Sequence, residues 1–454
     1  MPSRLSRRTS LLIVFALAAA VAAGLSSRSA SALTPRPVEL LSADKQLEVR
    51  EGWLRKRHGM ILPLMRRHGI GAWIVVSEEF HEDPLAGYVA PPRPYVGNRD
   101  VFAFFDAGDQ GLKKLAVTGY AEESVERFFE SPQGGAGIKA LKEWVDRYRP
   151  ATIALGIGGR RGVTRSLTHD SYKWLVENLG PEAEKRFTSA AGLIEDYLDT
   201  RIPEEFEHYA ALVRATETLA RRALSNEVIR PGKTTVGEVR MWLFRESGRL
   251  GLKPWFQPDL RLQRRSRADE KTASGFLTVA RESAVILRGD VVHLDFGLSY
   301  MGLSSDWQKM AYVLAAGEKR APAGLERALD NTNVLQDTVA RLSRPGRAAA
   351  DVYDEIMAEM KAKGIVAQVY SHPLGPQGHG LGASIDFRSA KREPDAPLKT
   401  LRLGSYLAME LNTSTPVPEW GGQMVTMMAE DPVYLSPEGW KFFRPRQEAL
   451  YLVK

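Results

Sequence analysis

The feature that most constrains the fold is an apolar run, Val291–Phe296, that carries a histidine and an aspartate. Its apolar residues predict a buried strand, and because side chains alternate between the faces of a strand, His293 and Asp295 point to the same side. A buried charge without a partner costs several kcal/mol, so these groups need partners. Asp306 follows Asp295 by eleven residues, beyond a turn at Gly302. A hairpin would bring the two carboxylates together.

Three further segments place ionisable groups in apolar or glycine-rich surroundings. His379 stands in the sequence Gly-His-Gly-Leu-Gly, where a backbone with few side chains lets a ligand approach closely. Glu410 lies alone in one apolar run, and Glu430 ends another. Asp295 and Asp306 by themselves fit either a metal site or a structural role at turns or in ion pairs. Together with the other three groups they favour a metal site.

The order acid, acid, histidine, acid, acid resembles metallopeptidase family M24, the pita-bread fold of aminopeptidases, prolidases and creatinase. In that family the first acid lies in a D-x-G strand, the second follows eleven residues later, and the histidine lies in G-H-G-x-G. The matching metal-binding positions here are Asp295, Asp306, His379, Glu410 and Glu430. The resemblance implies an α+β fold, with a pita-bread catalytic domain over residues 201–454. A smaller α/β creatinase-like domain would precede it over residues 33–200.

The resemblance also implies the chemistry. Two divalent metal ions would be held by the five residues, and Glu410 would also move a proton from water to the leaving nitrogen. Manganese is favoured, with cobalt, iron and zinc as alternatives, because the ligand types do not choose among them. A metal-bridging hydroxide would cleave an N-terminal peptide bond, as in an Xaa-Pro aminopeptidase. The alternatives are a C–N hydrolase of a small non-peptide amide and a binding homologue without activity. A homodimer is expected from the family.

Near the substrate the sequence departs from the family pattern. Family members usually carry a histidine upstream of the first acid, a second histidine seven residues after the ligand histidine, and an arginine two residues before the last acid. The upstream histidine is missing, and the other two places hold Asp386 and Met428. His372 and His293 are therefore predicted to supply catalytic groups, with a structural role as the alternative for each. The other histidines lie in polar contexts, and no function is predicted for them.

The first 32 residues resemble an export signal. Basic residues precede an apolar run of 14 residues, and Ala30-Ser31-Ala32 follows. A helix of that length spans ~21 Å, less than the ~30 Å core of a bilayer, so cleavage near Ala32 is expected rather than a stable membrane anchor. The protein would then be periplasmic or secreted. Arg7 and Arg8 suit a twin-arginine signal as well as a general one.

Composition narrows the partners. Cysteine is absent, which excludes thiol catalysis, Cys-ligated zinc and disulfides. The formal charge is +7, but four arginines of the export segment supply more than half of that excess. The remaining charge does not argue for nucleic acid, so a peptide or a small amide is the expected partner.

Periodicity predicts the elements around these residues. In the first domain we expect strands within 69–76, 101–105, 114–117 and 152–155. In the second we expect helices after Pro203, after a capping box at Thr235–Glu238, and from Asp351 to a stop at Gly364. Strands are predicted within 285–287, 291–296 and 310–314.

Overall fold

The computed structural model describes residues 40–454, apart from residue 96 and the segments 120–122, 133–134, 267–275 and 389–397. The predicted export signal lies outside the described residues, so its cleavage stays a prediction. Among the helices of the described residues, none has the length and apolar character that crossing a membrane requires.

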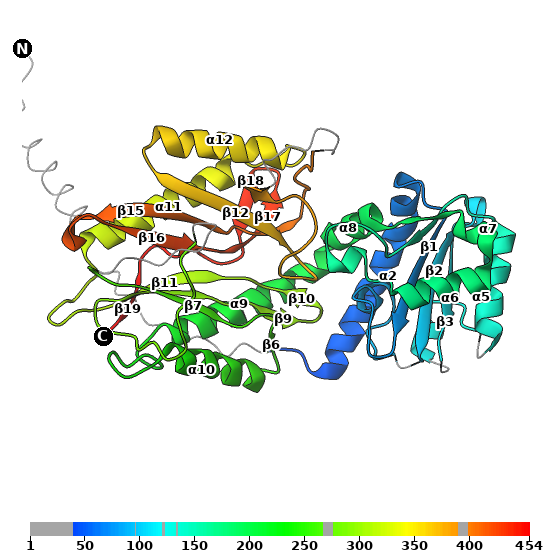
Figure 1. Cartoon of the computed structure of the whole chain (residues 1–454), viewed down its shortest axis with the longest axis horizontal. Coiled ribbons are helices and arrows are strands. Elements are labelled where there is room, and N and C mark those ends of the chain that lie inside the picture. Colours follow the sequence, from blue (N-terminus) through cyan, green and yellow to red (C-terminus); the bar gives the residue numbers. More distant parts are fainter. Residues whose placement is uncertain (1–39, 96, 120–122, 133–134, 267–275, 389–397) are drawn as a thin grey trace, which may run out of the picture. The chain divides into compact units, whose positions relative to one another are not determined.

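Residues 40–200 contain one mixed sheet with the strand order β3-β2-β1-β4-β5 (Figure 1). Its strands are β1 (Ala72–Glu78), β2 (Arg99–Asp106), β3 (Leu112–Val117), β4 (Ile153–Leu155) and β5 (Phe187–Ser189). Strand β1 pairs antiparallel with β2 and parallel with β4. The four strands predicted in this region are confirmed.

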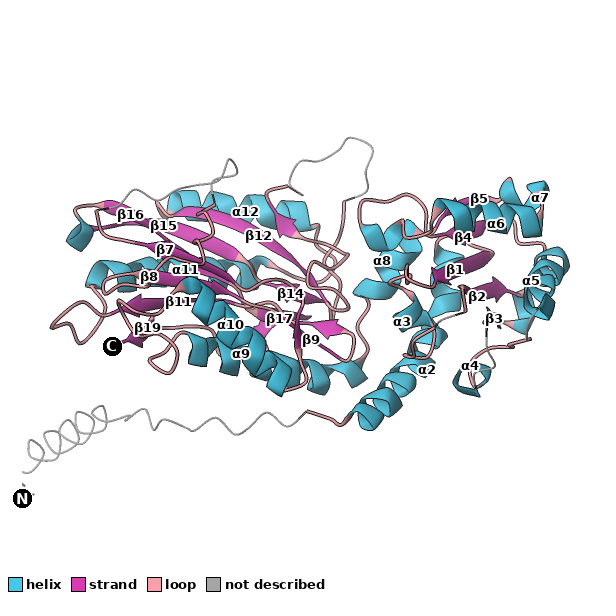
Figure 2. Cartoon of the chain, turned by 60° about the horizontal axis from the view of Figure 1, so that its bottom comes forward, coloured by secondary structure: helices cyan, strands magenta, loops and turns pink. Residues whose placement is uncertain are grey.

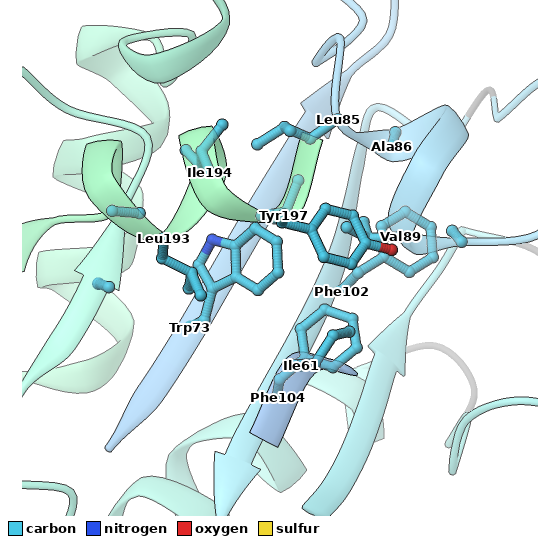
Figure 3. Close-up of a cluster of buried hydrophobic side chains, with 14 of the residues drawn as sticks. Ile61, Trp73, Leu85, Ala86, Val89, Phe102, Phe104, Leu193, Ile194 and Tyr197 are labelled. Carbon is cyan, nitrogen blue, oxygen red and sulfur yellow. The ribbon is translucent and has the colours of Figure 1, made fainter. Parts of the chain in front are cut away.

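Helices cover both faces of this sheet, because β1 and β2 bury apolar side chains on both sides. The helices are α2 (Ala43–Arg67), α3 (Ala86–Val89), α4 (Glu123–Glu126), α5 (Gly135–Tyr148), α6 (His169–Leu179), α7 (Pro181–Glu184) and α8 (Ala191–Asp199). Figure 3 shows the face covered by α2 and α8, where the ring of Trp73 of β1 packs beside both Phe104 and Tyr197. On the other face, Phe105 packs against Trp144 of α5. This is the predicted α/β arrangement.

One histidine of α2 lies inside this apolar interior. His58 is buried, with its ring 5.5 to 5.7 Å from the rings of Phe104, Phe128 and Phe129. The prediction of a polar context for His58 was therefore wrong. Its place on the inner face of α2 is set by packing against β2.

The second half of the chain is built on two larger sheets and a small one. Their strand orders are β19-β11-β8-β7, β16-β15-β12-β14-β17-β18 with β13 beside β12, and β10-β9-β6. The strands are β6 (Lys253–Pro254), β7 (Asp259–Gln263), β8 (Val291–Asp295), β9 (Leu298–Tyr300), β10 (Leu303–Ser304), β11 (Gln308–Val313), β12 (Val366–Leu374), β13 (Ile385–Asp386), β14 (Tyr406–Ala408), β15 (Leu411–Val417), β16 (Gln423–Ala429), β17 (Pro432–Ser436), β18 (Gly439–Phe442) and β19 (Tyr451–Val453). This mixed content confirms the predicted α+β class.

Four long helices accompany these sheets. They are α9 (Phe206–Ala223), α10 (Val236–Arg249), α11 (Ala323–Leu342) and α12 (Ala349–Ala362). Figures 1 and 2 show α9 and α10 on one side of the strands and α12 on the other. Helix α11 packs against β15 and β16, and α12 against β12 and β13.

Local sequence signals set most of the boundaries. Helix α10 begins at the predicted capping box, in which Thr235 and Glu238 bond to each other's backbone N–H groups. Gly364 follows α12 with a φ of +67°, a conformation that glycine adopts without strain. The strand predicted at 285–287 is wrong, since Val285 forms only an isolated bridge with Thr235.

Candidate metal centre

Asp295 and Asp306 lie together, as the predicted hairpin requires. Asp295 ends β8, and Asp306 lies two residues before β11. The two strands pair antiparallel, with Gln308 opposite Asp295. Between them the chain turns at Gly302, which has a φ of +74°. Oxygen atoms of Asp295, Asp306 and Glu430 lie within 4.8 Å of one another.

The two remaining acids come from the seven-stranded sheet. Glu410 lies between β14 and β15, and Glu430 directly follows β16. The backbones of Glu430 and Gln308 exchange two hydrogen bonds, of 3.2 and 3.3 Å, which join the two large sheets at this point. Glu430 is 0% exposed, whereas Glu410 is half-buried. Glu410 is therefore better placed than Glu430 to meet a molecule that arrives from solvent.

His372 lies at the centre of the acidic cluster. Its Nε2 atom lies 3.7 Å from Asp306 Oδ2, 3.4 Å from Glu410 Oε2 and 3.5 Å from Glu430 Oε1. Strand β12 holds it there by pairing His372 with Ala408 of β14. The ring is buried, and Nε2 has no hydrogen-bond partner among the described residues.

His379, the predicted imidazole ligand, lies farther out. Its side chain is exposed, and one ring nitrogen lies within 4.8 Å of an Asp306 oxygen and of a His372 nitrogen. The rings of His372 and His379 are 4.7 Å apart and nearly perpendicular. Partial burial and the charges of His372, Arg161 and Arg388 lower the pKa of His379 to about 4. The structure thus brings both histidines to the cluster, but only His372 among three carboxylates.

The sequence held a signal for this arrangement. Ser-His-Pro-Leu-Gly around His372 keeps the histidine and the final glycine of the G-H-G-x-G motif, and His379 follows seven residues later. The glycine-rich motif around His379 is the more complete match, so the sequence alone favours His379.

The carboxylates are strongly perturbed. Burial first, and then the charges of neighbouring acids, raise the pKa values of Asp295, Asp306 and Glu430 well above their usual range. Burial also opposes protonation of His372, but the contact with Glu410 and the charge of Asp306 outweigh it and raise the pKa of His372. Without cations the cluster therefore holds protons that isolated acids would release.

The same atoms fit divalent cations. Five buried ligand-type atoms have no hydrogen-bond partner among the described residues, and together they form one cluster. They are Asp295 Oδ1, Asp306 Oδ1, His372 Nε2, Glu430 Oε1 and Glu430 Oε2. A buried polar atom left unpaired costs about 1–3 kcal/mol, so five in one place indicate a missing partner. Carboxylate oxygens with one imidazole nitrogen form a ligand set for divalent transition metals.

His293 lies beside the cluster but touches none of its acids. The ring is buried, and burial, with the charge of Arg261, lowers the pKa of His293 to about 4, so the imidazole is neutral at pH 7. Its Nε2 atom lies 3.0 Å from Gln308 Oε1. The Gln308 amide in turn donates to Asp295 and Glu410. Sequence reasoning missed Gln308, which carries no charge and stands out only once the strand register is known.

A buried ion pair lies directly behind Glu430. Lys309 Nζ donates to Asp431 Oδ1 at 2.5 Å and to the backbone carbonyl of Glu430 at 3.1 Å. Trp307 Nε1 also donates to Asp431, at 3.1 Å. These contacts fix the backbone that carries Glu430. Gln336 donates to the other oxygen of Asp431, at 2.9 Å, so both oxygens are bound and Asp431 is not part of the cluster.

The rim of the cluster is aromatic on one side. Trp255 packs 5.2 Å from the ring of His379 and donates its Nε1–H to the backbone of Ser305. Asp386 is buried and bound by two nitrogens of Arg388. Met428 is buried in an apolar cluster with α11. Neither Asp386 nor Met428 faces the cluster as a free polar group.

Comparisons with known proteins agree with this geometry. The sequence model of metallopeptidase family M24 matches residues 208–435, roughly half of the chain. The structure of an X-Pro aminopeptidase from Thermotoga maritima matches with 16% identity and a TM-score of 0.64, over 86% of this chain and 100% of that one. An Xaa-Pro dipeptidase from Bacillus anthracis matches with 17% identity and a TM-score of 0.59, over 90% and 100%. A prolidase from Pyrococcus horikoshii matches with 16% identity and a TM-score of 0.56, over 89% of this chain and 99% of that one.

No curated protein matches the sequence. The predicted pita-bread fold is confirmed.

Proposed function

We propose, from the premise that this chain belongs to metallopeptidase family M24, that it binds two divalent cations and hydrolyses the N-terminal bond of peptides with proline in second place. The observation that carries the proposal is the cluster of five buried ligand atoms without hydrogen-bond partners among the described residues. The four negative charges of these carboxylates are neutralised by two divalent cations. The peptide class is supported by the similar aminopeptidase and dipeptidase structures.

The proposed ligands are the four predicted acids and His372, which takes the place predicted for His379. Among the histidines that the structure describes, only His372 has a ring nitrogen within 4 Å of three of the carboxylates. With His372 as ligand, His379 stands seven residues later, where family members usually carry a second histidine. The apparent substitution of that histidine by Asp386 then disappears. The proposed ligand set is Asp295, Asp306, His372, Glu410 and Glu430.

Divalent cations in such a site polarise an amide carbonyl and lower the pKa of a water molecule. The chain's own groups do the rest. Glu410, half-buried beside His372, is placed to accept a proton from water and to pass it to the leaving nitrogen. His379, neutral at pH 7, can donate a ring N–H to the carbonyl oxygen as negative charge develops on it. Trp255 offers an apolar wall for the proline ring.

One observation favours substrates without a terminal carboxylate near the centre. Family members place an arginine where Met428 stands, and Met428 is buried among apolar side chains. We therefore expect Xaa-Pro-Xaa peptides to be better substrates than Xaa-Pro dipeptides. The same observation keeps a small non-peptide amide as the second candidate substrate. An inactive binding homologue is disfavoured, because all the ligand types are present.

The remaining parts of the proposal rest on sequence. Export after cleavage near Ala32 rests on the n-region, apolar run and Ala-x-Ala order. Manganese is the proposed metal because the oxygen-rich ligand set suits it, with cobalt, iron and zinc as alternatives. A homodimer rests on the family alone.

The test combines metal analysis with a substrate screen. Purified protein is loaded with Mn²⁺, and Xaa-Pro, Xaa-Pro-Xaa and small amides are assayed alongside His372→Ala and His379→Ala. The proposal expects about two metal ions per chain, loss of metal in His372→Ala, and retained metal with a lower kcat in His379→Ala. The reverse pattern would restore His379 as the ligand. No metal uptake, or no hydrolysis of any peptide, would refute the proposed function.

A further inference from the structure

Gln308 contacts three of the four acids of the metal centre. It lies two residues after Asp306, and its backbone exchanges two hydrogen bonds with Glu430. Its side-chain Nε2 donates to Asp295 Oδ2 at 3.3 Å and to Glu410 Oε1 at 2.5 Å. Since Gln308 is directly opposite Asp295 in the hairpin, the amide needs only its ordinary length to reach both carboxylates.

The chemistry of these partners fixes which end of the amide faces them. When Asp295 and Glu410 are ionised, as cation binding requires, they can only accept hydrogen bonds, so the NH₂ group of Gln308 points toward them. The opposite orientation would bring the amide oxygen against two negatively charged groups. The amide oxygen is thereby left facing the interior of the sheet.

His293 is the group that meets this oxygen. Its Nε2 lies 3.0 Å from Gln308 Oε1, so Nε2 carries the proton and donates it. The other ring nitrogen, Nδ1, has no hydrogen-bond partner among the described residues. His293 is 1% exposed and Gln308 is 2% exposed, so water does not compete for this bond. A one-way chain of donors therefore runs from His293 through Gln308 to two acids.

We infer that Gln308 is a positioning residue that orients Asp295 and Glu410 for cation binding, and that His293 acts through it by fixing the amide orientation. The inference rests on the metal centre of the proposed function. It replaces the predicted catalytic role of His293, since no atom of that ring is hydrogen-bonded or ion-paired to an acid of the cluster in the described structure.

The expected effect follows from the role of partners behind metal ligands. Such partners hold the ligand rotamer in place, and their loss typically costs ~10- to 100-fold in metal affinity. Gln308→Met keeps the length and volume of the side chain but removes both hydrogen-bonding functions. We expect its Mn²⁺ dissociation constant to rise by ~10- to 100-fold. His293→Leu leaves the amide in place but unfixed, so a smaller rise is expected.

A double-mutant cycle in Mn²⁺ affinity tests the inference, with affinity measured by competition with a chromophoric chelator. The cycle uses the parent, Gln308→Met, His293→Leu and the double variant. Because His293 acts through Gln308, adding His293→Leu to Gln308→Met should not weaken binding further. The matched control is Gln263→Met, since Gln263 is a similarly buried glutamine of β7 whose side chain, among the described residues, bonds only to the backbone of Thr426. Its affinity should equal that of the parent.

Circular dichroism checks the fold of each variant, and Gln308→Asn, whose amide is too short to reach both acids, replaces Gln308→Met if the latter does not fold. A parent that takes up no divalent cation would overturn the proposed function and this inference with it. A parent that binds Mn²⁺ while Gln308→Met binds it equally well would overturn the inference alone. Equal losses in Gln308→Met and Gln263→Met, or a further loss in the double variant, would also overturn it.

Discussion

The interior of the N-terminal sheet and the interior of the metal centre are buried to the same degree but are built from opposite chemistry. In the first, Trp73, Phe104 and Tyr197 are 0% exposed and pack against aromatic and aliphatic neighbours. In the second, Asp306 and Glu430 are 3% and 0% exposed and face other acids. Apolar burial stabilises by about 25 cal/mol per Å². Burying unpaired acids costs free energy instead.

The difference teaches what each half requires. The apolar interior needs no ligand, because its side chains bury apolar surface against one another. In the acidic interior the carboxylates repel one another, which costs free energy of folding. The surrounding apolar core and a bound cation would offset that cost. Mutations and ligands should therefore act on the two interiors independently.

The largest effect is expected from Glu430→Gln. The change keeps the shape of the side chain but removes a charge whose two oxygens have no hydrogen-bond partner among the described residues. Metal-ion catalysis supplies several kcal/mol of transition-state stabilisation, so we expect kcat/KM to fall by roughly 10⁴-fold. Metal content should fall as well. Steady-state kinetics on an Xaa-Pro-Xaa peptide, with metal analysis of the variant, measure both.

The control for this prediction is Glu438→Gln, at an exposed position of the same half of the chain. It should match the parent in activity and metal content. If Glu430→Gln kept its metal and its rate, Glu430 would have no place in the centre.

Trp73→Ala should have the largest effect on stability and none on the metal. Trp73 is 0% exposed and packs against Phe104 and Tyr197, so the truncation removes apolar contacts and leaves a cavity. Losses of about 3–5 kcal/mol in the free energy of unfolding are typical for such changes. Urea denaturation measures this loss, with Phe80→Ala, at a 98% exposed position, as the control. A matching loss of Mn²⁺ affinity in Trp73→Ala would show that the two interiors are coupled.

Cation binding at the acidic cluster should stabilise the folded protein. A ligand that binds only the folded state adds RT ln(1 + [L]/Kd), which is about 2.7 kcal/mol at a hundredfold excess over Kd. Thermal unfolding with a chelator and with Mn²⁺ measures the gain as a rise in Tm. The gain should be the same in Trp73→Ala, because none of the four acids belongs to the apolar cluster around Trp73 in the described structure. An unchanged Tm in the parent would argue against a cation at the cluster.

Much of the centre could be predicted because its acids carry strong local signals. Asp295 and Asp306 follow from an apolar strand, a glycine turn and a hairpin, all of which the sequence encodes over a few residues. Glu410 and Glu430 are conspicuous as charges in apolar runs. Their order along the chain then indicates the family, and through it the fold.

The rest depends on pairing between distant segments. His372 enters the cluster because β12 pairs with β14. Its local signal, Ser-His-Pro-Leu-Gly, is weaker than the intact glycine-rich motif around His379. The contacts of Gln308 depend on the register of β8 and β11, and burial of His58 depends on which face of α2 meets β2. Register and helix orientation are set by tertiary packing, so a single sequence does not reveal them.

The smallest expected effect is a pH dependence of stability that arises from His58 in the apolar interior. Burial, together with the charge of Lys114, lowers the pKa of His58 to about 3, against about 6.5 in an unfolded chain. Between these values the unfolded state binds a proton that the folded state does not. The stability linked to neutral His58 is therefore fully present above pH 6.5 and is lost as the pH falls toward 3. The slope is about 1.4 kcal/mol per pH unit, or about 2 kcal/mol between pH 6.5 and 5.

His58→Gln can keep both polar contacts, since its NH₂ can donate to the Val89 carbonyl and its oxygen can accept from Lys114. Glutamine does not titrate, so this variant should lose about 2 kcal/mol less than the parent over that range. Urea denaturation at pH 7 and 5 measures the difference, with exposed His169→Gln as the control. Equal acid sensitivity in the parent and His58→Gln would mean that the apolar interior tolerates the imidazolium, and the contrast with the acidic centre would lose its basis.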